Sequence, residues 1–306
     1  AIKWWKLAAK QGDTFAQKKL KENLGSVNED DLEDGRDALK RKDYDTAYNL
    51  LLPLAEKGNA EAQFELGTLY RKTEEGSKEI VKWYRLAAEQ GHASSQYWLA
   101  TLYFYGLGVL KDYKEALRLW ATGAKYGSAL TQYNFGLMYA QGHGVSKDLK
   151  EAVKWWTLAS ERGLAEAQIK LGVHYYTGQG VTKDYKKAFK WFFLAAKQGN
   201  SMSQLNLGIM YQSGLGVQQD FKKALKWWSK AAEQGNLGAQ VNLGVMFAAG
   251  KGVTKDYKEA LKWVKIANEN GDGGIELRDK LEMKMTPSQI DKANKLAREW
   301  IENHRN

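Results

Sequence analysis

The chain has 306 residues, of which 43% are hydrophobic and 27% are charged, and only two are prolines. This composition indicates a folded, helix-rich chain and excludes an intrinsically disordered one. The absence of cysteine excludes disulfides, thiolate metal sites and a cysteine nucleophile. The formal net charge of +10 favours anionic partners, mainly through the rate of encounter.

The first part of the chain is irregular. Residues 1–12 read as the second half of a helical repeat, so we expect further units upstream or a chain cut inside one. These residues lack the charged start and apolar core of a secretory signal. A polar, acidic linker is expected at 21–34, and an opening helix pair from Asp30 to Gly58. The predicted divisions are a partial repeat and linker at 1–27, opening and shortened repeats at 28–92, five regular repeats at 93–271, and C-terminal capping helices at 272–306.

A tetrapeptide of the form Gly-x-Gly-Val recurs every 36 residues, which is the spacing of a solenoid repeat. Its copies begin at Gly106, Gly142, Gly178, Gly214 and Gly250. The same step relates a glutamine series, an aromatic series and an aspartate series, which begin at Gln96, Tyr103 and Asp112. A shorter unit, with a clipped loop at 72–77, precedes the regular ones.

Each unit contains two helical patterns, because apolar residues return at three- and four-residue spacing. In one unit these patterns are Ser94 to Tyr105 and Tyr113 to Lys125. Gly106 can adopt the left-handed conformation that ends the first helix. Asp112 is expected to cap the second helix, and Glu115 to complete a capping box. The sequence therefore predicts an all-α fold, an α/α solenoid of helix-turn-helix repeats.

Small and large residues both recur inside the predicted helices. A mid-helix glycine costs about 1 kcal/mol relative to alanine, so its recurrence predicts a close crossing of two backbones. These glycines are Gly136, Gly172, Gly208 and Gly244. The recurring tryptophans are expected to pack between helices, and they are Trp83, Trp155, Trp191, Trp227 and Trp263 in one register and Trp120, Trp156 and Trp228 in the next.

One unit combines nearly all of these features: Leu207-Gly208, Tyr211, Gly214-Leu-Gly-Val217, Asp220, Lys223-Ala224, Trp227 and Ala231-Ala232-Glu-Gln-Gly235. This set resembles the Sel-one-like repeats (SLR), relatives of the tetratricopeptide repeats, and the resemblance covers roughly residues 30–271. The resemblance implies a right-handed superhelix that acts as an adaptor, often in bacterial proteins that meet host or envelope partners. It implies no catalytic activity. It favours a periplasmic or secreted location in a bacterium, with the cytoplasm as the alternative.

No catalytic residue, metal site or cofactor is expected. The Gly-x-Gly-Val loops follow helices rather than strands, and they lack the ending of a phosphate-binding loop. No serine lies in a nucleophile elbow, and helix caps and solvated faces account for the acidic residues. The histidines do not pair at metal-ligand spacing, and they are His92, His143, His174 and His304.

Lysines follow the second predicted helices, and two interpretations are open. As a basic stripe, they would bind anionic surfaces such as phosphoinositide membranes or nucleic acid. Nucleic acid is disfavoured, because its binders usually pair such charge with exposed aromatic residues. As a solvated face, the lysines would cover the tryptophans with their stems and keep their ammonium groups in water. The lysines are Lys114, Lys150, Lys186, Lys222 and Lys258, with Lys154, Lys190, Lys226 and Lys262 one turn on.

The opposite side of the first helix is predicted to bind a protein or peptide partner along a concave groove. Steps of about 100° place the registers of Trp98 and Tyr105 on this side if Leu99 and its neighbours face the core. The methionine-rich register of Leu102 runs alongside and would adapt to apolar partners, or else pack between first helices. The predicted binding residues are Trp98, Leu102, Tyr105, Asn134, Met138, Gln141, Lys170, His174, Asn206, Met210, Asn242 and Met246.

Overall fold

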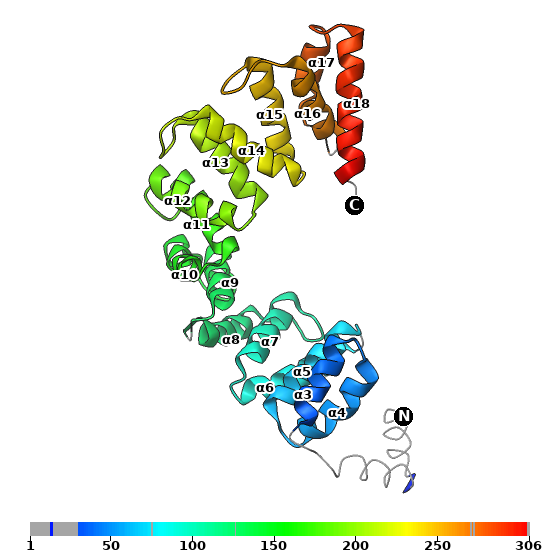
Figure 1. The fold of residues 1–306 in the computed structure, drawn as a ribbon. Coiled ribbons are helices and arrows are strands. Elements are labelled where there is room, and N and C mark those ends of the chain that lie inside the picture. The colour runs from blue at the N-terminus through cyan, green and yellow to red at the C-terminus, as the bar shows by residue number, and fades with distance from the viewer. Residues whose placement is uncertain are drawn as a thin grey trace. The chain divides into compact units, whose positions relative to one another are not determined.

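The computed structural model describes residues 13–14, 30–74, 76–125, 127–269, 271 and 273–304. The regular elements of this described part are helices, labelled α3 to α18, and it contains no strand (Figure 1). The predicted all-α class is therefore confirmed. None of these helices is long and apolar enough to cross a membrane. The half repeat expected at 1–12 lies outside the described residues.

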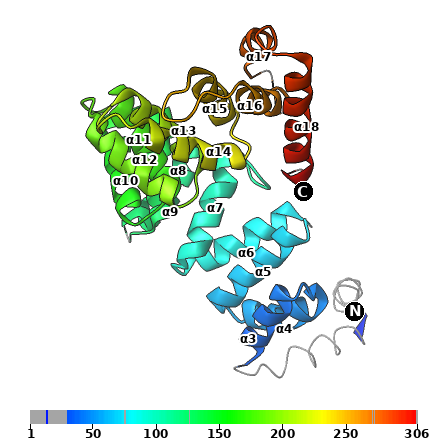
Figure 2. The ribbon, with the colours of Figure 1, turned by 45° about the horizontal axis from the view of Figure 1, so that its top comes forward.

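The chain consists of two compact units, Ala1–Lys147 and Asp148–Asn306. The described helices of the first unit are α3 (Asp31–Lys40), α4 (Tyr44–Glu56), α5 (Ala60–Lys72), α6 (Ser77–Glu89), α7 (Ala93–Tyr105), α8 (Tyr113–Lys125) and α9 (Ala129–Gln141). Those of the second unit are α10 (Leu149–Glu161), α11 (Ala165–Thr177), α12 (Tyr185–Lys197), α13 (Ser201–Ser213), α14 (Phe221–Glu233), α15 (Leu237–Ala249), α16 (Tyr257–Glu269), α17 (Ile275–Glu282) and α18 (Pro287–His304). Within each unit, neighbours in sequence pack together as in a solenoid (Figures 1 and 2).

The helix ends follow local sequence signals. Helices α7 and α8 match the two predicted helical segments to within one residue. Gly106 is left-handed, with φ of 74°, and its N–H donates to the Leu102 carbonyl over 2.8 Å. The Asp112 carboxylate accepts from the N–H groups of Lys114 and Glu115, at 2.9 and 3.0 Å. The predicted glycine stop and aspartate cap are therefore confirmed.

The predicted capping box is wrong. Its glutamate would have to accept the backbone N–H of the capping aspartate, but the Asp112 N–H already donates to the Tyr103 carbonyl over 3.0 Å. Glu115 instead pairs with Arg118 at 2.6 Å. The loop folds back on the end of the first helix, and this closure uses the N–H group that a capping box needs.

The glutamine series seals the junctions between repeats. The side chain of Gln204 donates to the Ala196 carbonyl over 3.3 Å, at the end of the preceding helix α12. Helix ends leave such carbonyls without intrahelical partners, so this bond satisfies one of them. Gln234 donates in turn to Gln204 over 2.8 Å. The recurring glutamines are therefore structural.

The mid-helix glycines make room for side chains of the facing helix, which are aromatic rings at Gly172 and Gly208 and Val264 at Gly244. The ring of Trp228 lies against α13 and donates from Nε1 to the Leu205 carbonyl over 3.1 Å, so a Cβ on Gly208 would overlap this nitrogen. A Cβ on Gly172 would lie 2.6 Å from the ring of Phe192. The close approach is thus confirmed, but it joins a helix backbone to a side chain rather than two backbones. At Gly208 the ring comes this close because Trp228 donates to a carbonyl of the facing helix.

The second glycine of each Gly-x-Gly-Val loop joins consecutive repeats. Gly216 has a φ of 70°, and a Cβ there would overlap the carbonyl oxygen of Tyr185, at the start of α12. Gly144 approaches Tyr113 in the same way in the first unit. Each loop therefore packs on the preceding second helix, and its glycine leaves the room for this contact.

Helices α17 and α18 close the C-terminal end of the second unit. Helix α18 packs on α16 and buries Ala293 and Ala297. The ring centroids of Trp263 and Trp300 lie 5.7 Å apart. These contacts cover apolar surface that the last repeat would otherwise expose, as terminal caps of repeat arrays do.

Candidate partner-binding site

Five of the twelve predicted binding residues are buried, and the structure corrects their assignment to a surface. They are Leu102, Met138, His174, Met210 and Met246. Met138 and Met210 are fully buried, and His174 hydrogen-bonds through Nδ1 to the Gln179 carbonyl at 2.7 Å. This register therefore packs inside the repeats, which was the alternative interpretation. Around the helix, the register of Leu102 lies about 40° from that of Trp98, on the side of the core. The register of Thr101 lies about 60° from that of Trp98 in the opposite direction.

Four positions in each repeat lie on the exposed side of the first helix. In α7 they are Ser94, Trp98, Thr101 and Tyr105, all half-buried or exposed. We call this side of α7, α9, α11, α13 and α15 the first-helix face. It keeps seven predicted residues: Trp98, Tyr105, Asn134, Gln141, Lys170, Asn206 and Asn242. The registers of Ser94 and Thr101 were missed, although spacings of three and four residues from Trp98 and Tyr105 point to them.

In the first unit the first-helix face is aromatic. The guanidinium of Arg71 lies 4.3 Å from the ring centroid of Trp98. Tyr105 is 61% exposed. The amide of Asn134 donates to the Tyr97 hydroxyl over 3.4 Å. The Trp98 ring and the Asn134 amide of this face therefore already have partners within the unit.

In the second unit the first-helix face combines exposed apolar residues with free amides. Met202 on α13 is 50% exposed, and Val245 on α15 is 43% exposed. Asn206 and Asn242 are half-buried on the same two helices, at equivalent positions one repeat apart. In the part of the chain that the structure describes, no hydrogen bond engages either side-chain amide. Each amide is thus available to a partner as both donor and acceptor.

The lysines of the second helices cover aromatic rings. The ammonium groups of Lys82, Lys190 and Lys262 lie 4.4, 4.9 and 4.7 Å from the ring centroids of Trp83, Trp191 and Trp263. This geometry supports the solvated-face interpretation. A second set is exposed and has no ion pair among the described residues, namely Lys150, Lys186 and Lys222.

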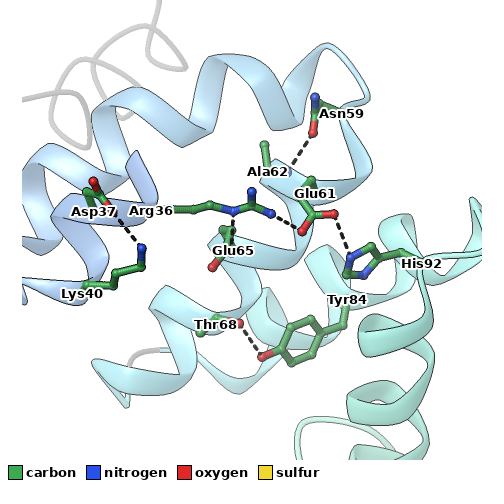
Figure 3. A network of polar contacts seen from close by, with 10 residues as sticks. All are labelled: Arg36, Asp37, Lys40, Asn59, Glu61, Ala62, Glu65, Thr68, Tyr84 and His92. Carbon is green, nitrogen blue, oxygen red and sulfur yellow. Dashed lines mark hydrogen bonds and ion pairs between the residues drawn. The ribbon is translucent and has the colours of Figure 1, made fainter. Parts of the chain in front are cut away.

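A polar network in the first unit joins α3, α5 and the start of α7 (Figure 3). Arg36 pairs with Glu61 and with Glu65, the latter at 3.0 Å, and Glu61 also contacts His92 Nε2 at 3.1 Å. His92 Nδ1 accepts from the Ser95 N–H over 3.2 Å and so caps α7. Every charged group of this network has a partner inside it. The network therefore fixes helices, and it leaves no acid or base free for chemistry.

Tyr84 lies beside this network. Its hydroxyl is 3.2 Å from Thr68 Oγ1 (Figure 3). Burial raises the pKa of Tyr84, although the hydrogen bond to Thr68 acts in the opposite direction. The phenol therefore stays protonated at neutral pH and acts as a packing residue. Among the described residues, no group of three or more histidine or acidic side chains is arranged to hold a metal ion.

Comparison with protein families identifies the repeats. The Sel1 repeat profile matches residues 1–13, 23–59, 81–92, 93–127, 129–164, 165–200, 201–236 and 238–272. The chain belongs to the Sel1 repeat family. Sel1 repeat proteins are generally scaffolds for protein–protein interactions. No curated protein sequence matches this Sel1 repeat chain.

Two crystal structures of bacterial proteins share the fold. A Sel1 repeat protein from Oxalobacter formigenes is 31% identical, with a TM-score of 0.66, and the alignment covers 78% of this chain and 97% of that one. The protein c5321, a protective antigen of uropathogenic Escherichia coli strains with an SLR fold, is 28% identical, with a TM-score of 0.56. That alignment covers 99% of this chain and 72% of the antigen. The Sel1 repeat solenoid is therefore shown by profile and by structure.

Proposed function

We propose that this Sel1 repeat protein is a non-enzymatic scaffold that binds a partner polypeptide along its first-helix face. The observation that carries the proposal is the pair of free amides, Asn206 and Asn242, set among exposed apolar side chains on α13 and α15. An asparagine amide matches the donor and acceptor of a peptide group. Two amides in consecutive repeats therefore suit an extended chain that crosses both helices.

The apolar residues beside the amides give the partner something to bury. Val173, Met202 and Val245 lie on three consecutive first helices and are each at least 39% exposed. Removing apolar surface from water drives most protein association. Methionine also adapts to different apolar shapes. The surface thus offers hydrophobic contact, while the amides set the register of the bound chain.

A peptide selection tests the proposal. Peptides from a displayed random library would be selected on the immobilised protein, and their affinities measured by calorimetry for wild type and for Asn206→Ala/Asn242→Ala. If each substitution removes one hydrogen bond of about 1 kcal/mol, the double change should lower the affinity about 30-fold. The melting temperature should stay within about 2 °C, because these half-buried side chains make no hydrogen bond among the described residues.

The matched control is Lys186→Ala/Lys222→Ala, which changes two exposed lysines of the second helices. This variant should bind the selected peptides like wild type, with little effect of salt between 50 and 200 mM. If the lysine variant loses binding and the asparagine variant keeps it, the protein instead recognises anionic surfaces. Such binding falls steeply with salt, because exposed charges are screened and, for nucleic acid, counterions are released.

A further inference from the structure

A cavity of about 420 Å³ opens in the first unit between α7, α8 and α9. Six rings line it: Tyr97, Phe104, Tyr105, Tyr113, Trp120 and His143. A cavity of about 150 Å³ is enough to bind benzene, and ligand pockets occupy about 300–1,000 Å³. The cavity is thus large enough for an aromatic side chain together with part of the chain that carries it.

The rings of this cavity support one another. The Phe104 centroid lies 4.9 Å from that of Tyr105, 5.2 Å from that of Tyr113 and 5.5 Å from that of Trp120. His143 stacks on Tyr113 with centroids 4.3 Å apart and an interplanar angle of 5°. Offset and edge-to-face pairs of this kind hold their members in place. The walls are therefore formed before any ligand arrives.

Two rings of this lining, Phe104 and Tyr105, depart from the other regular repeats, whereas most repeats keep an aromatic residue at the positions of Tyr113 and Trp120. At the position of Phe104, the following repeats have Ala140, Tyr176, Gln212 and Ala248. At the position of Tyr105 they have Gln141, Thr177, Ser213 and Ala249. The solenoid forms with polar or small residues at nearly all positions equivalent to Phe104 and Tyr105, so the fold does not require these two rings.

Two polar atoms of residues that line the cavity lack hydrogen-bond partners in the described part of the chain. Trp120 is only 4% exposed, and one of these atoms is its Nε1. The equivalent Trp228 donates to the Leu205 carbonyl over 3.1 Å, but the carbonyl equivalent to that of Leu205, on Tyr97, accepts instead from Thr101 over 2.9 Å. The other atom is His143 Nδ1, which also has no partner among the residues that the structure describes. Both atoms are themselves buried, so this unmet hydrogen-bonding capacity belongs to the packing behind the cavity surface and is not offered to a ligand.

The charge of the cavity wall also favours one kind of ligand. Among the described residues that line the cavity, Lys111 is the one charged side chain, and none carries a carboxylate. Lys111 is exposed, with its ammonium 5.7 Å from the Tyr113 ring centroid. A carboxylate at the cavity mouth would therefore be attracted rather than repelled.

We infer that this cavity binds an aromatic side chain of a partner polypeptide in which an acidic residue adjoins the aromatic one. The ring packs among Phe104, Tyr105 and Trp120, and the neighbouring carboxylate pairs with Lys111. The inference rests on the proposed function, because it assumes a polypeptide partner. It adds a sequence preference that the first-helix face of the second unit does not supply.

Three blocked tripeptides test the preference: acetyl-Asp-Phe-Asp-amide, acetyl-Asp-Ala-Asp-amide and acetyl-Lys-Phe-Lys-amide. Saturation-transfer NMR reports which peptide protons touch the protein, and its titration gives a dissociation constant for weak ligands. We expect saturation of the phenylalanine ring protons in the Asp-flanked peptide, with at least fivefold weaker binding for the other two. Equal binding of the Lys-flanked peptide, or no binding of the Asp-flanked peptide, would overturn the inference.

The cavity variants borrow residues from other repeats, so that the fold is retained. Phe104→Ala/Tyr105→Gln installs the residues of α9 at these positions, Ala140 and Gln141, and should weaken the Asp-flanked peptide at least tenfold. Lys111→Gln installs the equivalent of Gln219 and should remove the preference for aspartate over lysine. The matched control Tyr176→Ala changes the equivalent of Phe104 in the second unit, and it should bind like wild type.

Further outcomes separate this inference from the scaffold proposal. If Asn206→Ala/Asn242→Ala loses the selected peptides but Phe104→Ala/Tyr105→Gln binds every probe like wild type, the cavity inference fails and the scaffold proposal stands. A dimer in sedimentation that dissociates on Tyr105→Gln would assign the cavity to a second copy of the chain, and this too would overturn the inference. Loss of the probes in the cavity variant alone, with the asparagine pair neutral, would keep the cavity and overturn the first-helix face of the second unit.

Discussion

Asn206 and Gly208 lie two positions apart on α13 and have opposite surroundings. Asn206 is half-buried, with no partner for its amide among the described residues, whereas Gly208 lies beneath the ring of Trp228. A two-residue step turns the helix by about 200°, so one position faces outward and the other faces the neighbouring helix. At this scale, position on the helix rather than residue polarity determines whether a side chain is available to a partner.

The change Gly208→Ala tests this packing. Alanine would gain about 1 kcal/mol of helix propensity, but its Cβ would overlap Trp228 Nε1. Overpacking of this kind costs about 1–3 kcal/mol, and the ring would also lose its bond to Leu205. We expect the free energy of unfolding in urea to fall by about 1–2 kcal/mol. Asn206→Leu should change it by less than about 0.5 kcal/mol, and equal losses would show that the two faces are misassigned.

The cap of α14 predicts a pH dependence. The Lys223 N–H, which Asp220 accepts at 2.9 Å, and the Lys223 ammonium hold the pKa of Asp220 below its ordinary value. A lowered pKa in the folded state contributes stability above the unfolded pKa of about 4, and this contribution is lost as pH falls through the folded pKa.

Thermal melts of Asp220→Asn and Asp220→Ala between pH 2.5 and 7 separate the cap from its charge. Asparagine keeps a capping oxygen, so Asp220→Asn should stay near wild type at pH 7 and lose less stability than wild type below pH 4. Asp220→Ala should be less stable at pH 7, because the first turn of α14 loses its acceptor. A wild-type acid slope in Asp220→Asn would show that this carboxylate does not contribute.

At the scale of elements, the loop between paired helices also connects one repeat to the next. Gly216 follows α13, yet it packs on Tyr185 at the start of α12, so one loop fixes three helices. Gly235 also has a positive φ, of 78°, but no atom lies within 4 Å of a Cβ built there. A side chain at Gly235 would therefore meet backbone strain alone, whereas a side chain at Gly216 would meet both backbone strain and close packing.

Alanine at each glycine measures the two effects. Gly235→Ala should cost about 1 kcal/mol, because alanine tolerates a left-handed conformation poorly. Gly216→Ala should cost about 1–3 kcal/mol more, because its Cβ would also overlap the Tyr185 carbonyl. Urea unfolding of both variants gives the comparison. Equal costs would mean that this loop does not hold consecutive repeats together.

At the scale of the whole molecule, stability within each unit depends on contacts between neighbours. In the second unit α13 packs on α12 and α14, and α16 packs on α18. Repeat arrays of this kind behave approximately as sums of nearest-neighbour terms. A local defect should therefore weaken its neighbours more than distant helices.

Hydrogen exchange of Gly208→Ala tests this locality. Protection should fall most in α13 and α14, less in α12 and α15, and least in α18 at the end of the unit. Mass spectrometry of peptic fragments would resolve the gradient. A uniform loss of protection from α10 to α18 would show instead that the unit unfolds as one cooperative block.

The sequence by itself determined the repeat, the helix limits and the caps. The 36-residue step is visible in the residue pattern itself, and the left-handed glycine at Gly106 and the carboxylate of Asp112 act within a few residues of their own position. The capping box could not be judged in this way, because its failure depends on where the Asp112 N–H goes when the loop closes on Tyr103.

The tertiary structure decided which side chains remain available. The periodicity of the sequence predicted the direction of the first-helix face to within about one residue. This accuracy was enough to place Asn206 and Asn242 on the face correctly, but it also placed the buried residues Met138 and Met210 on the surface. The aromatic cavity was not foreseen, because its lining comes from three helices and a loop whose approach no single segment encodes. Burial and free hydrogen-bonding groups are properties of packed neighbours, and only the assembled repeats define those neighbours.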